Sequence, residues 1–269
     1  MSIPLEDLFN DVINKAQRGL GYTSDALADK VGVTAAAVDA TKEGATDAAI
    51  LLKLAAALGL HGPSLAEMSD HAWYPEPVAL DGLAQFNTPF HDMTVNAYLV
   101  WDPATKEAAA FDTGASAQPI VDRIQELGLT LRYLFLTHTH PDHVADIPTL
   151  QAPRVLISEL EPHPEAETFP PGSQWTLGSL SISSRVTTGH SKGATTYVIE
   201  GLARPLAIVG DAIFASSMGG GAVSFTDALA TNRAQIFTLP DETILCPGHG
   251  PMTTVGEEKQ HNPFYPEFK

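Results

Sequence analysis

The sequence has little cysteine, little positive charge and no long apolar run. Its 269 residues include one cysteine, Cys246, which excludes an intrachain disulfide and a zinc site built from four cysteines. Lys and Arg number 15 against 32 Asp and Glu, so the formal net charge is −17. A nucleic-acid partner and an anionic membrane surface are both disfavoured, because each needs clustered basic side chains.

No stretch approaches the roughly 18 apolar residues that a membrane span requires. The first seven residues also lack the basic and then apolar layout of a signal peptide. We therefore expect a protein of the cytoplasm that acts on a small molecule and has no membrane partner. An apolar content of 44% with 17% charged residues is ample for a core, and the length suits one large domain with an accessory one.

The composition changes near residue 70. Residues 1–70 are rich in alanine and helical in period, whereas short β-rich runs separated by Gly and Pro follow Pro75 and Pro77. This predicts an all-α module over residues 1–70 and a second domain over residues 71–269. We expect three or four short helices in the first part, over residues 5–18, 24–30, 35–42 and 47–58.

The helical module carries a pattern of small and apolar residues from Asp25 to Thr34 that resembles a helix-turn-helix unit. It is most similar to the N-terminal helical module of cyanase-type proteins. Residues 1–70 hold five basic against ten acidic residues, and the expected recognition helix offers only Lys42. Because a DNA-reading helix carries several base- and phosphate-binding side chains, we favour a packing or homo-oligomerisation module. A DNA-binding metabolite sensor stays open as an alternative.

Residues 71–269 read as mixed α/β. A hairpin is expected from strands 95–100 and 108–111, and residues 133–136 form a short apolar strand of the kind that is buried on both faces. Helices are expected over residues 116–127 and 225–237. Further strands are expected over residues 155–158, 182–186, 195–199, 206–209 and 243–246.

A dense group of polar residues directly follows the apolar strand 133–136. Within six residues stand His138, His140, Asp142 and His143. Alternate residues of an extended segment face the same way, so His138 and His140 can grip one ion together. Asp142 and His143 lie just beyond, where a turn would aim them at a second ion. Imidazole and carboxylate are ligands that zinc, iron and manganese accept.

Three more polar residues stand beside glycine at expected strand ends. His190 follows Gly189, Asp211 follows Gly210, and His249 lies between two glycines in a Pro-Gly-His-Gly-Pro segment. Each alone would more often be an ordinary loop residue. Together with the first group they form a set of seven candidate ligands.

This order of motifs, His-x-His-x-Asp-His, Gly-His, Gly-Asp and Pro-Gly-His-Gly, resembles the metallo-β-lactamase superfamily over about residues 78–265. The resemblance implies an α/β fold, an αβ/βα sandwich with two divalent ions between its sheets. Zinc is the expected metal, and iron or manganese would accept the same ligands. It assigns His138, His140 and His190 to the first ion, Asp142, His143 and His249 to the second, and Asp211 to both. Asp142 and Asp211 would be the catalytic carboxylates.

Within the superfamily the chain is most similar to the glyoxalase II-like, or hydroxyacylglutathione hydrolase-like, branch. That implies a thioesterase in which hydroxide held between two ions attacks the thioester carbonyl. Lys192 and Phe214 are the candidate substrate contacts. Relatives of this branch often have a Gly-Arg-Thr-Asp segment after the Gly-Asp motif, whereas residues 217–222 here contain no basic side chain.

Two other activities remain open on the same ligand set. One is a lactonase or another ester hydrolase, although Phe214 lacks the hydroxyl that acyl-homoserine lactonases usually place near this point. The other is a persulfide dioxygenase with a single iron.

Overall fold

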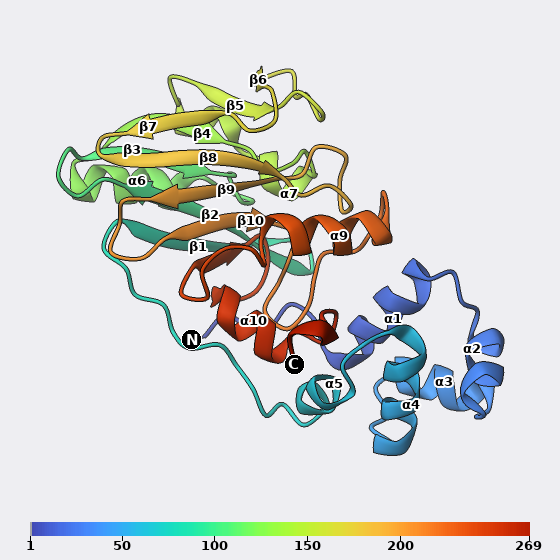
Figure 1. The fold of residues 1–269 in the computed structure, drawn as a ribbon. Helices are drawn as coiled ribbons and strands as arrows, with labels where there is room; N and C mark the ends of the chain where they lie inside the picture. The colour runs from blue at the N-terminus through green and yellow to red at the C-terminus, as the bar shows by residue number, and fades with distance from the viewer. Residues whose placement is uncertain (1) are drawn as a thin grey trace.

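Two six-stranded β-sheets face each other and carry helices on their outer sides (Figure 1). The computed structural model describes residues 2–269. The strand order is β1-β2-β3-β4-β5-β6 in one sheet and β12-β11-β10-β9-β8-β7 in the other. The predicted αβ/βα sandwich with helices at its N-terminus is therefore confirmed.

The first sheet begins with antiparallel strands and continues with parallel ones. The predicted hairpin is present, because β2 pairs antiparallel with β3. Strands β3, β4, β5 and β6 are then parallel neighbours. The sequence did not predict β1, whose Pro89 is compatible with an edge strand. The strands are β1 (Leu83–Phe90), β2 (Met93–Trp101), β3 (Glu107–Phe111), β4 (Thr130–Phe135), β5 (Val155–Ser158) and β6 (Glu167–Phe169).

The second sheet is antiparallel except for one parallel pair, β10 with β11. The parallel pair places the ends of β10 and β11 at the same edge, where the loops that follow them meet. The strands are β7 (Gln174–Leu177), β8 (Leu180–Val186), β9 (Thr195–Glu200), β10 (Leu206–Gly210), β11 (Ile244–Pro247) and β12 (Thr253–Thr254).

Three apolar clusters hold the layers together. Aromatic side chains of both sheets, including Tyr98, Phe111, Phe135 and Tyr197, pack between them. A second cluster lies under the helices of the first sheet, and a third under those of the second sheet. The outer helices are α6 (Gln118–Leu127), α7 (Pro141–Val144), α8 (Ile147–Leu150), α9 (Phe225–Gln235) and α10 (Val255–His261), and a 3₁₀ turn, η1 (Pro266–Phe268), ends the chain.

Five helices precede the sheets, where the sequence predicted three or four. The additional helix is α5, and its second residue is Pro63, which a first helical turn tolerates because the missing N–H has no intrahelical acceptor there. The prediction for the first helix was also wrong at its start, because α1 begins at Phe9 rather than at residue 5. The helices are α1 (Phe9–Gly19), α2 (Ser24–Val31), α3 (Ala35–Lys42), α4 (Ala48–Leu58) and α5 (Gly62–Ser69).

These five helices share a hydrophobic cluster with the outer side of the second sheet. Val12 and Leu65 belong to the same cluster as Val209 and Phe225, and Figure 1 shows the N-terminal helices gathered beside α10. The boundary near residue 70 and the role of the helices in homo-oligomerisation remain predictions. No helix among residues 2–269 is long and apolar enough to cross a membrane.

Candidate metal centre

The segment after β4 carries four of the seven candidate ligands. The strand ends at Phe135, and His138 and His140 follow in the segment before α7, with His140 in extended backbone. His140 is the N-cap of α7, and Asp142 and His143 lie in this helix. The turn expected after His140 is thus a single helical turn that begins with Pro141. It brings Asp142 and His143 to the same edge of the sheets as the first two histidines.

The other three residues come from the facing sheet. His190 lies in the loop between β8 and β9, Asp211 directly follows β10, and His249 follows β11. The parallel pairing of β10 with β11 brings Asp211 and His249 to one edge. All seven predicted residues therefore meet at one edge of the sandwich, between the two sheets.

The seven side chains form two groups. Within each group, all the ligand atoms lie within 4.8 Å of one another. One group holds His138, His140, His190 and Asp211, and the other holds Asp142, His143 and His249. In the first group, His190 Nε2 lies 2.9 Å from His140 Nδ1. In the second, His249 Nε2 lies 3.3 Å from Asp142 Oδ2.

Asp211 lies between the two groups. Its Oδ1 is 3.4 Å from His143 Nε2, and its Oδ2 is 3.3 Å from His190 Nε2 and 3.4 Å from His249 Nε2. One carboxylate therefore faces imidazoles of both groups, as the sequence predicted for a shared ligand. That the seven residues bind metal remains a prediction.

Several atoms of this site lack ordinary partners. His138 Nε2, His143 Nε2 and Asp211 Oδ1 are buried and make no hydrogen bond to any of residues 2–269. Buried polar atoms are seldom left unpaired, because each loses its hydration. The close packing also leaves no room for a side chain at Gly248, where a Cβ would stand 2.1 Å from Asp211 Oδ1. Metal cations bound between these atoms would give each of them a partner. The residues present therefore fit a metal centre.

The charges of the site are strongly coupled. Burial disfavours the imidazolium forms of His143 and His249, but the nearby carboxylates outweigh burial and raise the pKa of His143 to about 10 and that of His249 to about 11. Burial also opposes ionisation of Asp211, yet His143 and His249 hold its pKa well below the usual range. The pKa of His138 is lowered, chiefly by burial. The site therefore holds Asp211 ionised, and the positive charge that balances it sits on His143 and His249. Metal binding requires neutral imidazoles, so a bound cation would take the place of these protons.

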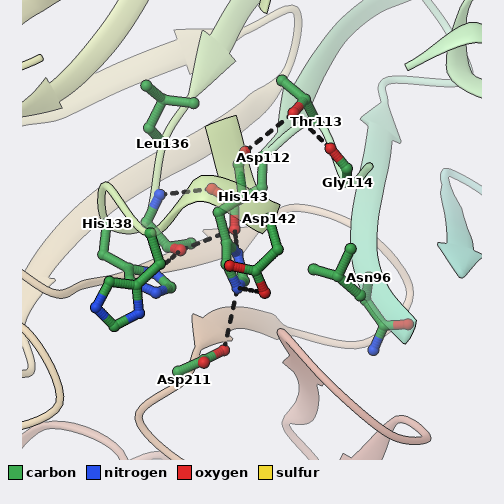
Figure 2. A network of polar contacts seen from close by, with 12 residues as sticks. Asn96, Asp112, Thr113, Gly114, Leu136, His138, Asp142, His143 and Asp211 are labelled. Atoms are coloured by element: carbon green, nitrogen blue, oxygen red, sulfur yellow. Dashed lines mark hydrogen bonds and ion pairs between the residues drawn. The ribbon is translucent and has the colours of Figure 1, made fainter. Parts of the chain in front are cut away.

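Asp112, which was not predicted from the sequence, orients His143. Asp112 Oδ2 accepts a hydrogen bond from His143 Nδ1 at 2.8 Å, so Nε2 points toward Asp211. Figure 2 shows His143 between Asp112 and Asp211. Thr137 also donates to Asp112, from its backbone N–H at 2.7 Å and its hydroxyl at 2.8 Å. The only signal in the sequence was an Asp-Thr-Gly at the end of an expected strand.

Backbone carbonyls orient two further histidines. His249 Nδ1 lies 2.7 Å from the carbonyl of Thr94, and His190 Nδ1 lies 2.9 Å from that of Gly220. In each case the opposite ring nitrogen faces Asp211. An imidazole that donates through one nitrogen can bind metal through the other, and such outer partners fix the ring orientation.

A buried and a partly buried polar side chain hold the loops of the site in place. Asn96 donates to the carbonyls of Pro247 and Gly250, at 2.9 and 2.8 Å, and so ties β2 to the loop of His249. Glu161 accepts from the backbone N–H groups of Thr139 and Gly193, both at 2.8 Å. It thereby joins the loop of His138 and His140 to that of His190. Neither role was predicted from the sequence.

The two candidate substrate contacts differ in their surroundings. Phe214 is buried, and its ring lies edge-on to that of His249, with 5.6 Å between centroids. Lys192 is exposed, two residues after His190. Both remain predictions as substrate contacts. Cys246 is buried in β11, where burial raises the pKa of its thiol, so it is not poised as a nucleophile.

Glu6 brings the N-terminal segment into this site. Its Oε2 lies 3.9 Å from His249 Nδ1, and burial raises its pKa to about 7. Residues before α1 thus run beside the metal centre instead of continuing the helix, which explains why α1 starts later than predicted.

A model of the metallo-beta-lactamase superfamily matches residues 92–249, a span that contains all seven candidate ligands. The chain belongs to this superfamily. It is therefore a metallo-hydrolase by family, and its two groups of His and Asp residues could hold metal ions. The match begins after the five N-terminal helices and after β1.

Named members of the superfamily are similar to much of the chain. A probable metallo-hydrolase of Streptococcus pyogenes serotype M6 is 29% identical over 62% of this chain and 84% of its own length. The hydroxyacylglutathione hydrolase GloC of Haemophilus influenzae is 28% identical over 63% of this chain and 92% of its own length.

A solved member of the superfamily shares the fold. The crystal structure of ETHE1 from Myxococcus xanthus superposes with a TM-score of 0.58, at 27% identity, over 68% of this chain and 85% of that one. These relatives carry different names at similar identities. The similarity therefore establishes the superfamily and not the substrate.

Proposed function

We propose that this protein is a hydrolase that holds two divalent metal ions and cleaves a thioester. The observation that carries the proposal is the position of Asp211, whose two oxygens face the histidines of both ligand groups at 3.3 to 3.4 Å. The similarity to hydroxyacylglutathione hydrolase GloC favours a thioester among the substrates of such a centre.

Each side chain has a definite part in this proposal. His138, His140 and His190 would hold one ion, and Asp142, His143 and His249 the other, with Asp211 between them. Two bound divalent ions would supply Lewis-acid chemistry, lowering the pKa of a water and polarising the carbonyl of the substrate.

The protein's own residues prepare the site for this chemistry. Asp112 and the carbonyls of Thr94 and Gly220 fix the ring orientations of His143, His249 and His190. Such prior orientation reduces the reorganisation needed when charge develops on the substrate. The buried Phe214 packs edge-on against the ring of His249, and Asn96 holds the loop that carries His249.

The test is hydrolysis of S-lactoylglutathione by metal-loaded protein, followed by loss of the thioester absorbance. We expect turnover that is lost in Asp211→Ala, with bound metal measured on the same samples by mass spectrometry. Homoserine lactones and simple aryl esters are assayed in parallel. Turnover of those compounds alone would replace the thioesterase proposal with the lactonase or ester hydrolase alternative.

Oxygen uptake with glutathione persulfide tests the remaining alternative. Consumption of oxygen by iron-loaded protein, without hydrolysis of any ester or thioester, would contradict the proposed function. Zinc-loaded protein is the control, because zinc has no redox chemistry.

A further inference from the structure

A cavity of about 260 Å³ lies between helix α1 and the loop that follows β10. Lys15, Arg18 and Gly19 line it from α1, and Gly220, Gly221 and Ala222 line it from the loop. The superfamily match begins at residue 92, so one wall of the cavity comes from outside the matched region.

The cavity adjoins the candidate metal centre. The carbonyl of Gly220, one of its lining residues, accepts a hydrogen bond from His190 Nδ1 at 2.9 Å. Lys15 Nζ lies 5.1 Å from the centre of the Phe214 ring, and that ring in turn contacts the ring of His249. Gly220 thus joins the cavity wall to the candidate ligand His190, whose other ring nitrogen faces Asp211.

The lining is cationic in a strongly acidic protein. It contains two basic side chains and no acidic one, although the formal net charge of the chain is −17. Lys15 is paired with Asp7 and also donates to the carbonyl of Met218 at 2.8 Å, so its charge is largely compensated.

Arg18 is the uncompensated cation. It is exposed, and no carboxylate among residues 2–269 comes within 4.0 Å of its guanidinium nitrogens. Its one hydrogen bond within this range runs from Nε to the carbonyl of Asn14 at 3.4 Å, which leaves the remaining N–H groups free. A guanidinium with free N–H groups matches the two oxygens of a carboxylate.

The loop wall leaves the cavity open. A Cβ at Gly220 would have no heavy atom within 4 Å. A volume of about 260 Å³ is below that of a typical site for a whole small ligand. The cavity thus suits one end of a substrate whose reacting bond lies at the metal centre.

We propose that this cavity binds a carboxylate of the substrate, with Arg18 making the contact. This proposal rests on the proposed function, because it assigns a negative charge to the thioester substrate that is proposed to react at the metal centre. It also accounts for residues 217–222, which lack the basic side chain expected after the Gly-Asp motif. Helix α1 supplies the positive charge instead, from a part of the chain about 200 residues earlier in the sequence.

The test compares S-lactoylglutathione with its diethyl ester, in which the carboxylates are masked. The ratio of kcat/KM for the free acid to that for the diester should fall about tenfold in Arg18→Met, mainly through KM, because a charged hydrogen bond is lost. Arg123→Met is the matched control. Arg123 is a half-exposed arginine on α6, on the other side of the molecule (Figure 1). Its substitution should leave the ratio at the wild-type value.

A second readout does not depend on turnover. The affinity of the metal-loaded protein for S-hexylglutathione, which has no thioester to cleave, is measured by calorimetry. It should weaken about tenfold in Arg18→Met and remain at the wild-type value in Arg123→Met.

The two readouts distinguish the two proposals. Thioester turnover with an unchanged ratio in Arg18→Met would overturn the role of the cavity and leave the proposed function standing. Absence of thioester turnover, together with Arg18-dependent binding of S-hexylglutathione, would overturn the proposed function and support the cavity. Absence of both would overturn both.

Discussion

Asp112 Oδ2 accepts a hydrogen bond from His143 Nδ1 at 2.8 Å, and both side chains are buried. The two residues lie 31 positions apart in the sequence, one after β3 and the other in α7. The contact determines which nitrogen of His143 faces Asp211. A residue outside the set of seven candidate ligands thus determines how one of them is presented.

Asp112→Asn should weaken the affinity for metal at the second group by about 10- to 100-fold, because the imidazole loses a charged partner. Metal content after dialysis against a graded chelator measures this. Asp122→Asn, an exposed substitution on α6, is the control and should retain wild-type affinity. Equal affinities in the two variants would contradict an orienting role for Asp112.

Asp211→Ala should lower bound metal and hydrolysis together, the latter by more than about a hundredfold, because both ligand groups lose their shared carboxylate. Metal analysis and turnover are measured on one preparation whose fold is checked by circular dichroism. Folded Asp211→Ala protein with full activity would rule out the assignment of Asp211 as a shared ligand.

Glu161→Ala should lower the free energy of unfolding by about 2 kcal/mol, because a partly buried carboxylate that joins the loops of Thr139 and Gly193 is lost. It should also weaken the affinity for metal at the first ligand group. Urea denaturation measures the stability, and Glu159→Ala, at an exposed neighbouring position, is the control. A loss of stability with unchanged metal affinity would limit Glu161 to a structural role.

Glu258→Gln should reduce the pH dependence of stability. Burial raises the pKa of Glu258 from its ordinary value of 4.5 to about 8, despite hydrogen bonds from Asn262, Thr253 and Ser216. Between these values the folded protein keeps a proton that the unfolded chain releases, so the free energy of unfolding contributed by this group falls as the pH rises.

Denaturation of the wild type at about pH 5 and about pH 8 should therefore show lower stability at the higher pH, and Glu258→Gln should show a smaller loss. Glu242→Gln, which removes the same charge at an exposed position, should behave as the wild type does. An undiminished loss in Glu258→Gln would show that this carboxyl is already ionised in the folded state.

Local signals in the sequence were sufficient for much of the fold. Helix α3 and strand β5 have the predicted bounds, and α2 and α4 differ from prediction by about a residue. The helix starts could be predicted because Thr23, Thr34 and Asp47 are residues that commonly cap helices, and each caps its helix here. Helices α5, α7, α8 and α10 and the strands β1, β6, β7 and β12 were missed. Most of them are short, and the two longest, α5 and β1, each contain a proline, which often interrupts regular structure, so tertiary packing decides whether such segments form.

The set of seven candidate ligands could be predicted because histidine and aspartate at the ends of apolar strands form a local pattern. Parallel strands end at the same edge of a sheet, and the two sheets pack face to face. The strand ends therefore meet at one edge of the sandwich, independently of the sequences of the intervening loops. The sequence by itself therefore determined the fold class, the superfamily and which residues gather at the site.

Only the tertiary structure decided which other residues serve that site. Asp112, Asn96 and Glu161 are single polar residues, and each contacts a partner distant in the sequence. Arg18, the proposed carboxylate contact, shares a cavity wall with residues about 200 positions away. Their positions depend on how the two sheets pack together and on how α1 packs against the loop that follows β10. The physical reason is that hydrogen bonds and charge pairs act over a few ångströms in space, a separation that spacing along the chain does not encode.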